Sequence, residues 1–205
     1  MKFHHTIIFG LLFFTAISIA ASDCADIEAF EKKLKEKPYI FLDFEQITRS
    51  VIFQAQDTIK GTIRTGGKGK FRIETPNQII VSNGILEWNY SRENKQVLID
   101  SLTRYDEYDP LTIIYDPLSV YSCQGQDNDN NKIVFHLEGI AKNTSPQELV
   151  ITVKSDNYEP LFLDYVDENG SDITVNIFDF KQATNIPESD FEFDPPDGVE
   201  VIFMP

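Results

Sequence analysis

Residues 78–90, with the sequence QIIVSNGILEWNY, decide the fold of this chain. Two runs rich in β-branched and aromatic residues flank the dipeptide Asn83-Gly84. This dipeptide is the strongest short signal for a β-hairpin, because both central turn positions need a positive φ. The stretch therefore predicts two antiparallel strands joined by a tight turn.

Strand patterns continue on both sides of this hairpin. Ile40, Leu42 and Phe44 occupy every second position, as in a half-buried strand. Further strands are expected at residues 51–56, 60–65, 70–75, 78–82, 85–90, 96–101, 132–139, 148–155, 158–166 and 171–180, with a short last candidate at 199–203. About eleven antiparallel strands result, and a single sheet of that length curls.

Helical signals interrupt the strands at two places. Residues 26–36 carry apolar side chains at helical spacing, and Pro38 ends the pattern. The middle of the chain repeats Asp-Pro-Leu at 109–111 and 116–118, and Asp followed by Pro is typical of a helix start. A polar loop is expected at 124–131. The predicted fold is therefore mainly β (α+β): a curled antiparallel half-barrel whose N-terminal helix and short helical insertion cover an apolar concave face.

The first 22 residues have the composition of a secretory signal peptide. Lys2 precedes the apolar run 7–17, and the small residues Ser18, Ala20, Ala21 and Ser22 follow it. The run is short for a membrane span, which needs about 20 apolar residues. We expect residues 1–22 to be removed and residues 23–205 to form one domain; an uncleaved N-terminal anchor is the alternative.

The two cysteines, Cys24 and Cys123, bear on anchoring and on stability. Bacterial lipidation needs a small residue directly before the modified cysteine, and Asp23 stands before Cys24. The sequence thus favours a soluble protein over a lipid-anchored one. In an oxidising compartment the two cysteines either pair or remain independent thiols, and sequence leaves both possibilities open.

Charge and motifs exclude several classes of function. The net charge of −15 repels phosphate backbones, so nucleic acid is not an expected partner. The chain lacks a Gly-x-Ser-x-Gly elbow, a His-Glu-x-x-His motif and a phosphate-binding glycine loop, and after removal of the leader His136 is its one histidine, expected to face solvent. We expect neither an enzyme nor a bound cofactor.

Residues 127–131 alternate oxygen-bearing side chains as a calcium loop does, with Glu138 at its twelfth position. Lys132 stands where such a loop needs glycine for its turn, and residues 133–137 alternate like a strand. The pattern therefore favours a polar turn, and no metal site is expected.

Four signatures together resemble the LolA family of periplasmic outer-membrane lipoprotein carriers. They are Phe-Glu-Gln at 44–46, Gly-Thr-Ile at 61–63 with Lys-Phe-Arg-Ile at 70–73, the block 78–97, and Phe-Glu-Phe-Asp-Pro-Pro-Asp-Gly-Val at 191–199. They occur in the family's order and span nearly the whole chain after the leader. The family's Arg-Pro pair, whose arginine holds the lid, is missing from Gly66-Gly67-Lys68-Gly69, and Ile73 replaces a family tryptophan. Lys68 is a donor at this place but lacks the planar fork of arginine.

The resemblance implies a soluble, monomeric periplasmic carrier of acylated lipoproteins. It would load from an inner-membrane lipoprotein-releasing ABC transporter and unload to an outer-membrane acceptor. The residues expected to contact the acyl chains are Phe44, Ile63, Phe71, Ile73, Trp88, Tyr90, Ile113 and Ile114. Ordinary core packing is the competing interpretation at each of these positions.

Two alternatives on the same fold remain open at this point. One is a lipid- or lipoprotein-sensing regulator that acts on a signalling partner. The other is a membrane-anchored lipoprotein acceptor, against which Asp23 argues.

Overall fold

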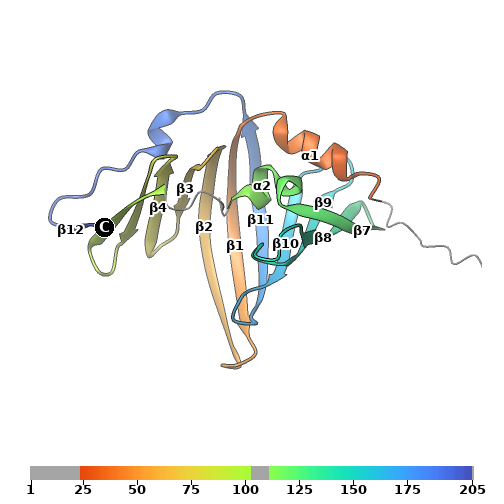
Figure 1. Cartoon of the computed structure of the whole chain (residues 1–205), viewed down its shortest axis with the longest axis horizontal. Helices are drawn as coiled ribbons and strands as arrows, with labels where there is room; N and C mark the ends of the chain where they lie inside the picture. Colours follow the sequence, from red (N-terminus) through yellow and green to blue (C-terminus); the bar gives the residue numbers. More distant parts are fainter. Residues whose placement is uncertain (1–23, 103–110, 205) are drawn as a thin grey trace, which may run out of the picture.

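The structure, a computed structural model, describes residues 24–102 and 111–204. Within them, twelve strands form one curled open sheet (Figure 1). In chain order these are β1 (Tyr39–Ser50), β2 (Ala55–Gly67), β3 (Lys70–Glu74), β4 (Gln78–Asn83), β5 (Leu86–Ser91), β6 (Gln96–Ser101), β7 (Tyr121–Asp129), β8 (Lys132–Gly139), β9 (Glu148–Lys154), β10 (Pro160–Val166), β11 (Asp172–Ala183) and β12 (Glu200–Phe203). The mainly β, curled-sheet fold predicted from the sequence is confirmed.

Two antiparallel meanders build the sheet. Its strand order is β12-β6-β5-β4-β3-β2-β1-β11-β10-β9-β8-β7, so the meanders meet where β1 pairs with β11. Strand β6 therefore lies close to one edge and β7 at the other. The chain between these two strands has to cross the sheet, and its described part lies over the concave face (Figure 1).

The N-terminal helix and the described helical turns of the insertion lie where the sequence predicted them. Helix α1 (Ile27–Lys35) falls within the predicted range 26–36. Helix α2 (Thr112–Tyr115) and the 3₁₀ turn η2 (Pro117–Ser119) follow the two Asp-Pro signals, although Asp109 and Pro110 themselves lie outside the described residues. A second 3₁₀ turn, η3 (Glu188–Phe191), precedes β12.

Helix α1 buries one face against the sheet. Its apolar side chains Ile27, Phe30 and Leu34 are buried, and the ring of Phe30 stacks on that of Phe135 with 5.5 Å between centroids. A disulfide joins Cys24, just before the helix, to Cys123 of β7. Both ends of the helix are thus held: the first by this bridge, the last by bonds from the Gln182 amide to backbone carbonyls of the helix.

Two local predictions are wrong. Residues 51–56 are not a separate strand: β1 continues to Ser50, residues 51–54 turn, and β2 begins at Ala55. Their β-branched and aromatic residues suggested a strand, but they lie at the end of a long hairpin where no further strand pairs with them. Residues 124–131 are not a loop, because β7 continues to Asp129 in register with β8. Polar side chains suit β7 because it is an edge strand, which charge and polarity protect from further pairing.

The end of the chain adds the twelfth strand. Strand β12 corresponds to the short last candidate at 199–203, which is not among the eleven strands predicted to be antiparallel, and it pairs with β6 in parallel. Parallel pairing needs a long connection that returns the chain to the same end of the sheet. Residues 184–199, called the strap here, make that connection from β11 to the far edge (Figure 1).

Candidate lipid-binding site

The concave face of the first meander is apolar. Directly opposed residues of an antiparallel pair share a face, and the pairing runs from Leu42 to Ile63, then to Ile73 and Ile80. A parallel row places Ile40 beside Thr65 and Phe71. Five of these side chains are at most 8% exposed: Ile40, Leu42, Ile63, Thr65 and Phe71.

The second meander continues the same surface. Phe44 opposes Ile177 across the β1–β11 pair, which joins the two halves. From there the face runs through Leu163, Ile151 and Phe135, all buried in the same apolar cluster. The concave side of the sheet is therefore one continuous apolar surface from β3 to β8.

Residues 111–120, called the cover segment here, lie on this surface. Leu111 and Ile114 are buried in the same cluster, and four half-buried side chains pack against it. Those four are Ile113, Tyr115, Leu118 and Val120. The apolar side chains of the cover segment thus pack directly on the concave face.

An ion pair joins the cover segment to α1. Nζ of Lys35 lies 2.8 Å from Oδ1 of Asp116 and 3.1 Å from Oε1 of Glu31. The Asp116 carboxylate, and then Glu31, raise the pKa of Lys35 above its ordinary value. The ion pair thus connects the cover segment to the last turn of α1.

The glycine-rich turn in place of the family's Arg-Pro pair serves a packing role. A Cβ on Gly67 would lie 3.9 Å from the ring of Tyr115, and the φ of Gly67 is +68°. The Lys68 side chain forms no hydrogen bond or ion pair with the described residues of the cover segment. Within the described residues, Lys68 therefore does not hold the cover segment.

Six of the eight predicted acyl-contacting residues lie together, and two do not. Phe44, Ile63, Phe71 and Ile73 are on the concave face, and Ile113 and Ile114 are on the cover segment above it. Trp88 and Tyr90, however, oppose Val81 and Ile79, whose side chains point to the other face. The prediction that these two rings line the concave face is wrong.

The strap explains why the convex face of β4 and β5 is apolar. Phe191 is 1% exposed and meets the Tyr39 ring edge-on at 6.4 Å, and Phe193 lies 5.7 Å from Tyr90. These contacts form a second apolar layer on the convex face. The aromatic pair Phe191 and Phe193 is the sequence feature that indicates this second apolar layer, and it also belongs to the family signature at 191–199.

Polar contacts fix the strap at its crossing point. The Tyr39 hydroxyl donates to Oδ2 of Asp190 at 2.5 Å, and Lys70 pairs with Glu188 at 2.6 Å. Burial, followed by the Asp190 carboxylate, raises the pKa of Tyr39 to about 12. The strap is thus an ordered part of the fold.

The apolar concave face ends at β5, where the inward positions become polar. Glu87 and Asn89 take the places that Trp88 and Tyr90 were expected to fill, and Glu87 directly opposes Asp100. Burial, and then the charge of Asp100, raise the pKa of the Glu87 carboxyl. An acyl chain on this face is therefore expected to stay between β4 and β8.

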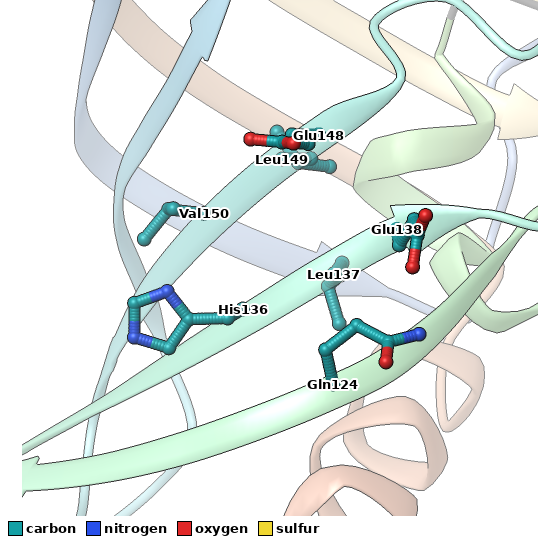
Figure 2. A pocket seen from close by; sticks show the side chains of 7 residues that line it. All are labelled: Gln124, His136, Leu137, Glu138, Glu148, Leu149 and Val150. Atoms are coloured by element: carbon teal, nitrogen blue, oxygen red, sulfur yellow. The ribbon is translucent and has the colours of Figure 1, made fainter.

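A hollow of about 270 Å³ lies on the other side of the sheet at β7–β9 (Figure 2). Its lining residues are Gln124, His136, Leu137, Glu138, Glu148, Leu149 and Val150. His136 is exposed, as predicted, and its Nε2 lies 2.9 Å from Oδ2 of Asp127. With two carboxylates and an imidazole around it, this hollow is unsuited to a hydrocarbon chain.

Metal sites and membrane-spanning helices were searched for only in the residues that the structure describes, 24–102 and 111–204. There, no group of three or more His, Cys, Asp or Glu side chains is arranged to hold a metal ion. Of the helices in this part of the chain, none is both long and apolar enough to cross a membrane.

A curled sheet with an apolar concave face under a short helical segment defines a class of binding proteins for hydrophobic groups. The family model described as "Outer membrane lipoprotein carrier protein LolA" matches residues 40–194, and the chain belongs to this family. It is a binding protein of a carrier family and not an enzyme.

Individual relatives are distant in sequence but similar in extent. An outer-membrane lipoprotein carrier protein of Pseudomonas aeruginosa (strain UCBPP-PA14) is 25% identical over 202 residues, covering 93% of this chain and 96% of the relative. One of Alcanivorax borkumensis is 23% identical over 148 residues, covering 70% of each chain. A crystal structure of an uncharacterized conserved protein from Thermus thermophilus superposes with a TM-score of 0.51 at 15% identity, covering 87% of this chain and 96% of that one.

Proposed function

We propose that this protein is a soluble periplasmic carrier that binds the acyl chains of lipoproteins on its concave face and moves them from the inner to the outer membrane. The observation that carries the proposal is the apolar concave face covered by the short segment 111–120. The names of the relatives favour a carrier over a sensor or an anchored acceptor.

The cover segment limits the affinity for cargo. Each buried methylene contributes about 0.8 kcal/mol, so a long acyl chain in a dry site is worth on the order of 10 kcal/mol. A carrier that kept all of this free energy would release its cargo too slowly. Displacement of Leu111 and Ile114 from the sheet exposes apolar surface, which offsets part of the gain and leaves a moderate net affinity.

The loading and unloading partners follow from the same proposal. Loading would occur from an inner-membrane lipoprotein-releasing ABC transporter, and unloading to an outer-membrane acceptor where one exists. Depletion of the protein, followed by fractionation of the envelope, is expected to leave lipoproteins in the inner membrane. Unchanged sorting after depletion would count against the shuttle role.

Binding itself is tested with a fluorescent hydrophobic probe and two peptides that differ only in acylation. The acylated peptide is expected to displace the probe and the plain peptide to leave it bound. Ile73→Gln changes a half-buried side chain of the concave face and is expected to weaken acyl-peptide binding about fivefold or more. The matched control Phe178→Gln alters a 52% exposed apolar side chain on the convex face and is expected to have no effect. Equal displacement by both peptides refutes the proposal.

A further inference from the structure

Strands β1 and β2 extend beyond the rest of the sheet. The pairing of β1 with β11 ends at Arg49 and Asp172, and the pairing of β2 with β3 ends at Thr62 and Glu74. The two strands continue to pair with each other as far as Ser50 and Ala55. The end of this hairpin, called the arm here, therefore runs well past β3 on one side, while on the other side β11 accompanies it to Arg49 and only the turn lies beyond (Figure 1).

The tip of the arm presents three consecutive large apolar side chains to solvent. Val51, Ile52 and Phe53 are 71%, 73% and 80% exposed, and they are called the apex here. In the turn that carries them, the Phe53 amide donates to Oγ of Ser50 at 3.3 Å and Gln54 takes a φ of 49°. The fold thus displays the apex instead of burying it.

The residues next to the apex in the sequence are uncharged, and Arg49 and Asp57 flank this uncharged stretch. From Ser50 to Gln56 there is no ionisable side chain, although a quarter of the whole chain is charged. The tip of a protein with net charge −15 thus carries seven consecutive uncharged residues. Entry of this tip into an apolar medium requires no charge to be desolvated.

We propose that the apex inserts into the interfacial region of a lipid bilayer, so that the protein touches the membrane itself. The shape of the tip favours lipid over a protein partner. A stable protein interface buries about 800 Å² on each partner, more than a three-residue convex turn presents. A fluid bilayer closes around such a tip without a preformed groove, and apolar side chains partition into its interface.

The contact is weak and reversible. Three side chains supply less apolar area than one acyl anchor, which by itself gives marginal membrane binding. The acidic remainder of the protein is repelled by anionic lipids, so contact is confined to the tip and is best on zwitterionic surfaces. Strands β1 and β2 also carry Phe44 and Ile63, so the arm connects the membrane contact to the concave face through about 23 Å of strand between Phe44 and Val51.

The test is flotation of the purified protein with vesicles of phosphatidylcholine and phosphatidylethanolamine. The variant V51S/I52S/F53S is expected to lose vesicle binding about 10-fold or more relative to the unaltered protein. The control I85S/I140S/V166S replaces apolar side chains that are 65%, 64% and 55% exposed elsewhere on the protein, and is expected to float as the unaltered protein does. Equal flotation of the apex variant and the unaltered protein overturns the proposal, as does an equal loss in the control.

Two further measurements distinguish membrane contact from cargo binding and from contact with a protein. Acyl-peptide binding is measured on the same variants and is expected to be unchanged. Failure of the carrier proposal would appear in the acyl-peptide assay, and failure of the membrane proposal would appear in the flotation assay. If the unaltered protein binds only vesicles that contain membrane proteins, the apex contacts a protein and the proposal is wrong. If the triple variant does not fold, Phe53→Trp replaces it: its emission should shift to shorter wavelength on pure lipid vesicles, and an unshifted spectrum overturns the proposal.

Discussion

Lys35 of α1 and Asp116 of the cover segment form an ion pair, with 2.8 Å between Nζ and Oδ1. The contact is electrostatic more than a directed hydrogen bond, because Oδ1 of Asp116 accepts no well-aligned hydrogen bond among the described residues. It connects the fixed helix to the segment that must move for cargo to enter.

Lys35→Met is expected to loosen the cover segment and increase binding of a hydrophobic probe about two- to fivefold. The magnitude is small because both side chains are partly exposed, and such pairs contribute at most about 1 kcal/mol. Probe titration at low and high salt provides the measurement, and the difference between variant and parent should shrink in high salt. Lys33→Met serves as the control, since Lys33 pairs with Glu36 within α1 and not with the cover segment.

Glu87→Gln is expected to stabilise the protein at pH 7. Two carboxylates directly opposed on a sheet destabilise it by about 0.2–1 kcal/mol, so the melting temperature should rise by about 1–3 °C. The sign follows from the raised pKa of Glu87: the folded protein holds this proton more tightly than the unfolded chain, so stability is lost as pH rises through the folded-state pKa. Below the ordinary carboxyl pKa of about 4.3 the variant and the parent should therefore melt alike. Lower stability of the variant at pH 7 would contradict this account of Glu87.

The positions of Trp88 and Ile73 on opposite faces give a spectroscopic prediction. In the unaltered protein, emission from the single tryptophan, Trp88, is expected to stay constant when acylated peptide binds, because its ring faces away from the concave side. In the double variant I73W/W88F, the ring lies on the concave face and its emission should change on binding. A large change from Trp88 alone would show that cargo reaches the strap side of the sheet.

Gly61→Ala is expected to destabilise the fold by about 1–3 kcal/mol, because close packing leaves no space for the added methyl group. A Cβ there would lie 2.8 Å from the ring of Phe44 and closer still to the carbonyl oxygen of Glu74. Denaturant unfolding provides the measurement. Gly125→Ala is the matched control in another strand, where the nearest atom to the new Cβ is the His136 ring at 4.0 Å. Equal stability of the two variants would refute the close packing at Gly61.

The hairpin at Asn83-Gly84 and helix α1 were predictable because turn chemistry and apolar spacing are local properties of a sequence. The face of β5 was not predictable in the same way. Alternation shows that Trp88 and Tyr90 share a face, but not which one is concave. Because the strap makes the convex side apolar as well, aromatic character did not distinguish the two faces.

Other differences arise from parts of the chain that meet only after folding. The parallel pairing of β12 depends on the long course of the strap, and no local pattern in residues 199–203 indicates it. The Lys35–Asp116 pair joins residues 81 positions apart. At 51–53, strand-forming residues end in a turn because nothing beyond Arg49 is available to pair with β1 on its outer side.

In the periplasmic location proposed above, the bridge between Cys24 and Cys123 has a consequence for how the protein matures. The chain contains two cysteines, so oxidation within one molecule has a single possible product. An exported chain therefore needs an oxidant but no isomerase to correct mispaired thiols. Cys24 is exported before Cys123, and strands β1 to β6 and the cover segment lie between the two cysteines in the chain. Cys24 therefore stays reduced until these elements have been exported. The disulfide forms late, when the strands that it links are already available to fold.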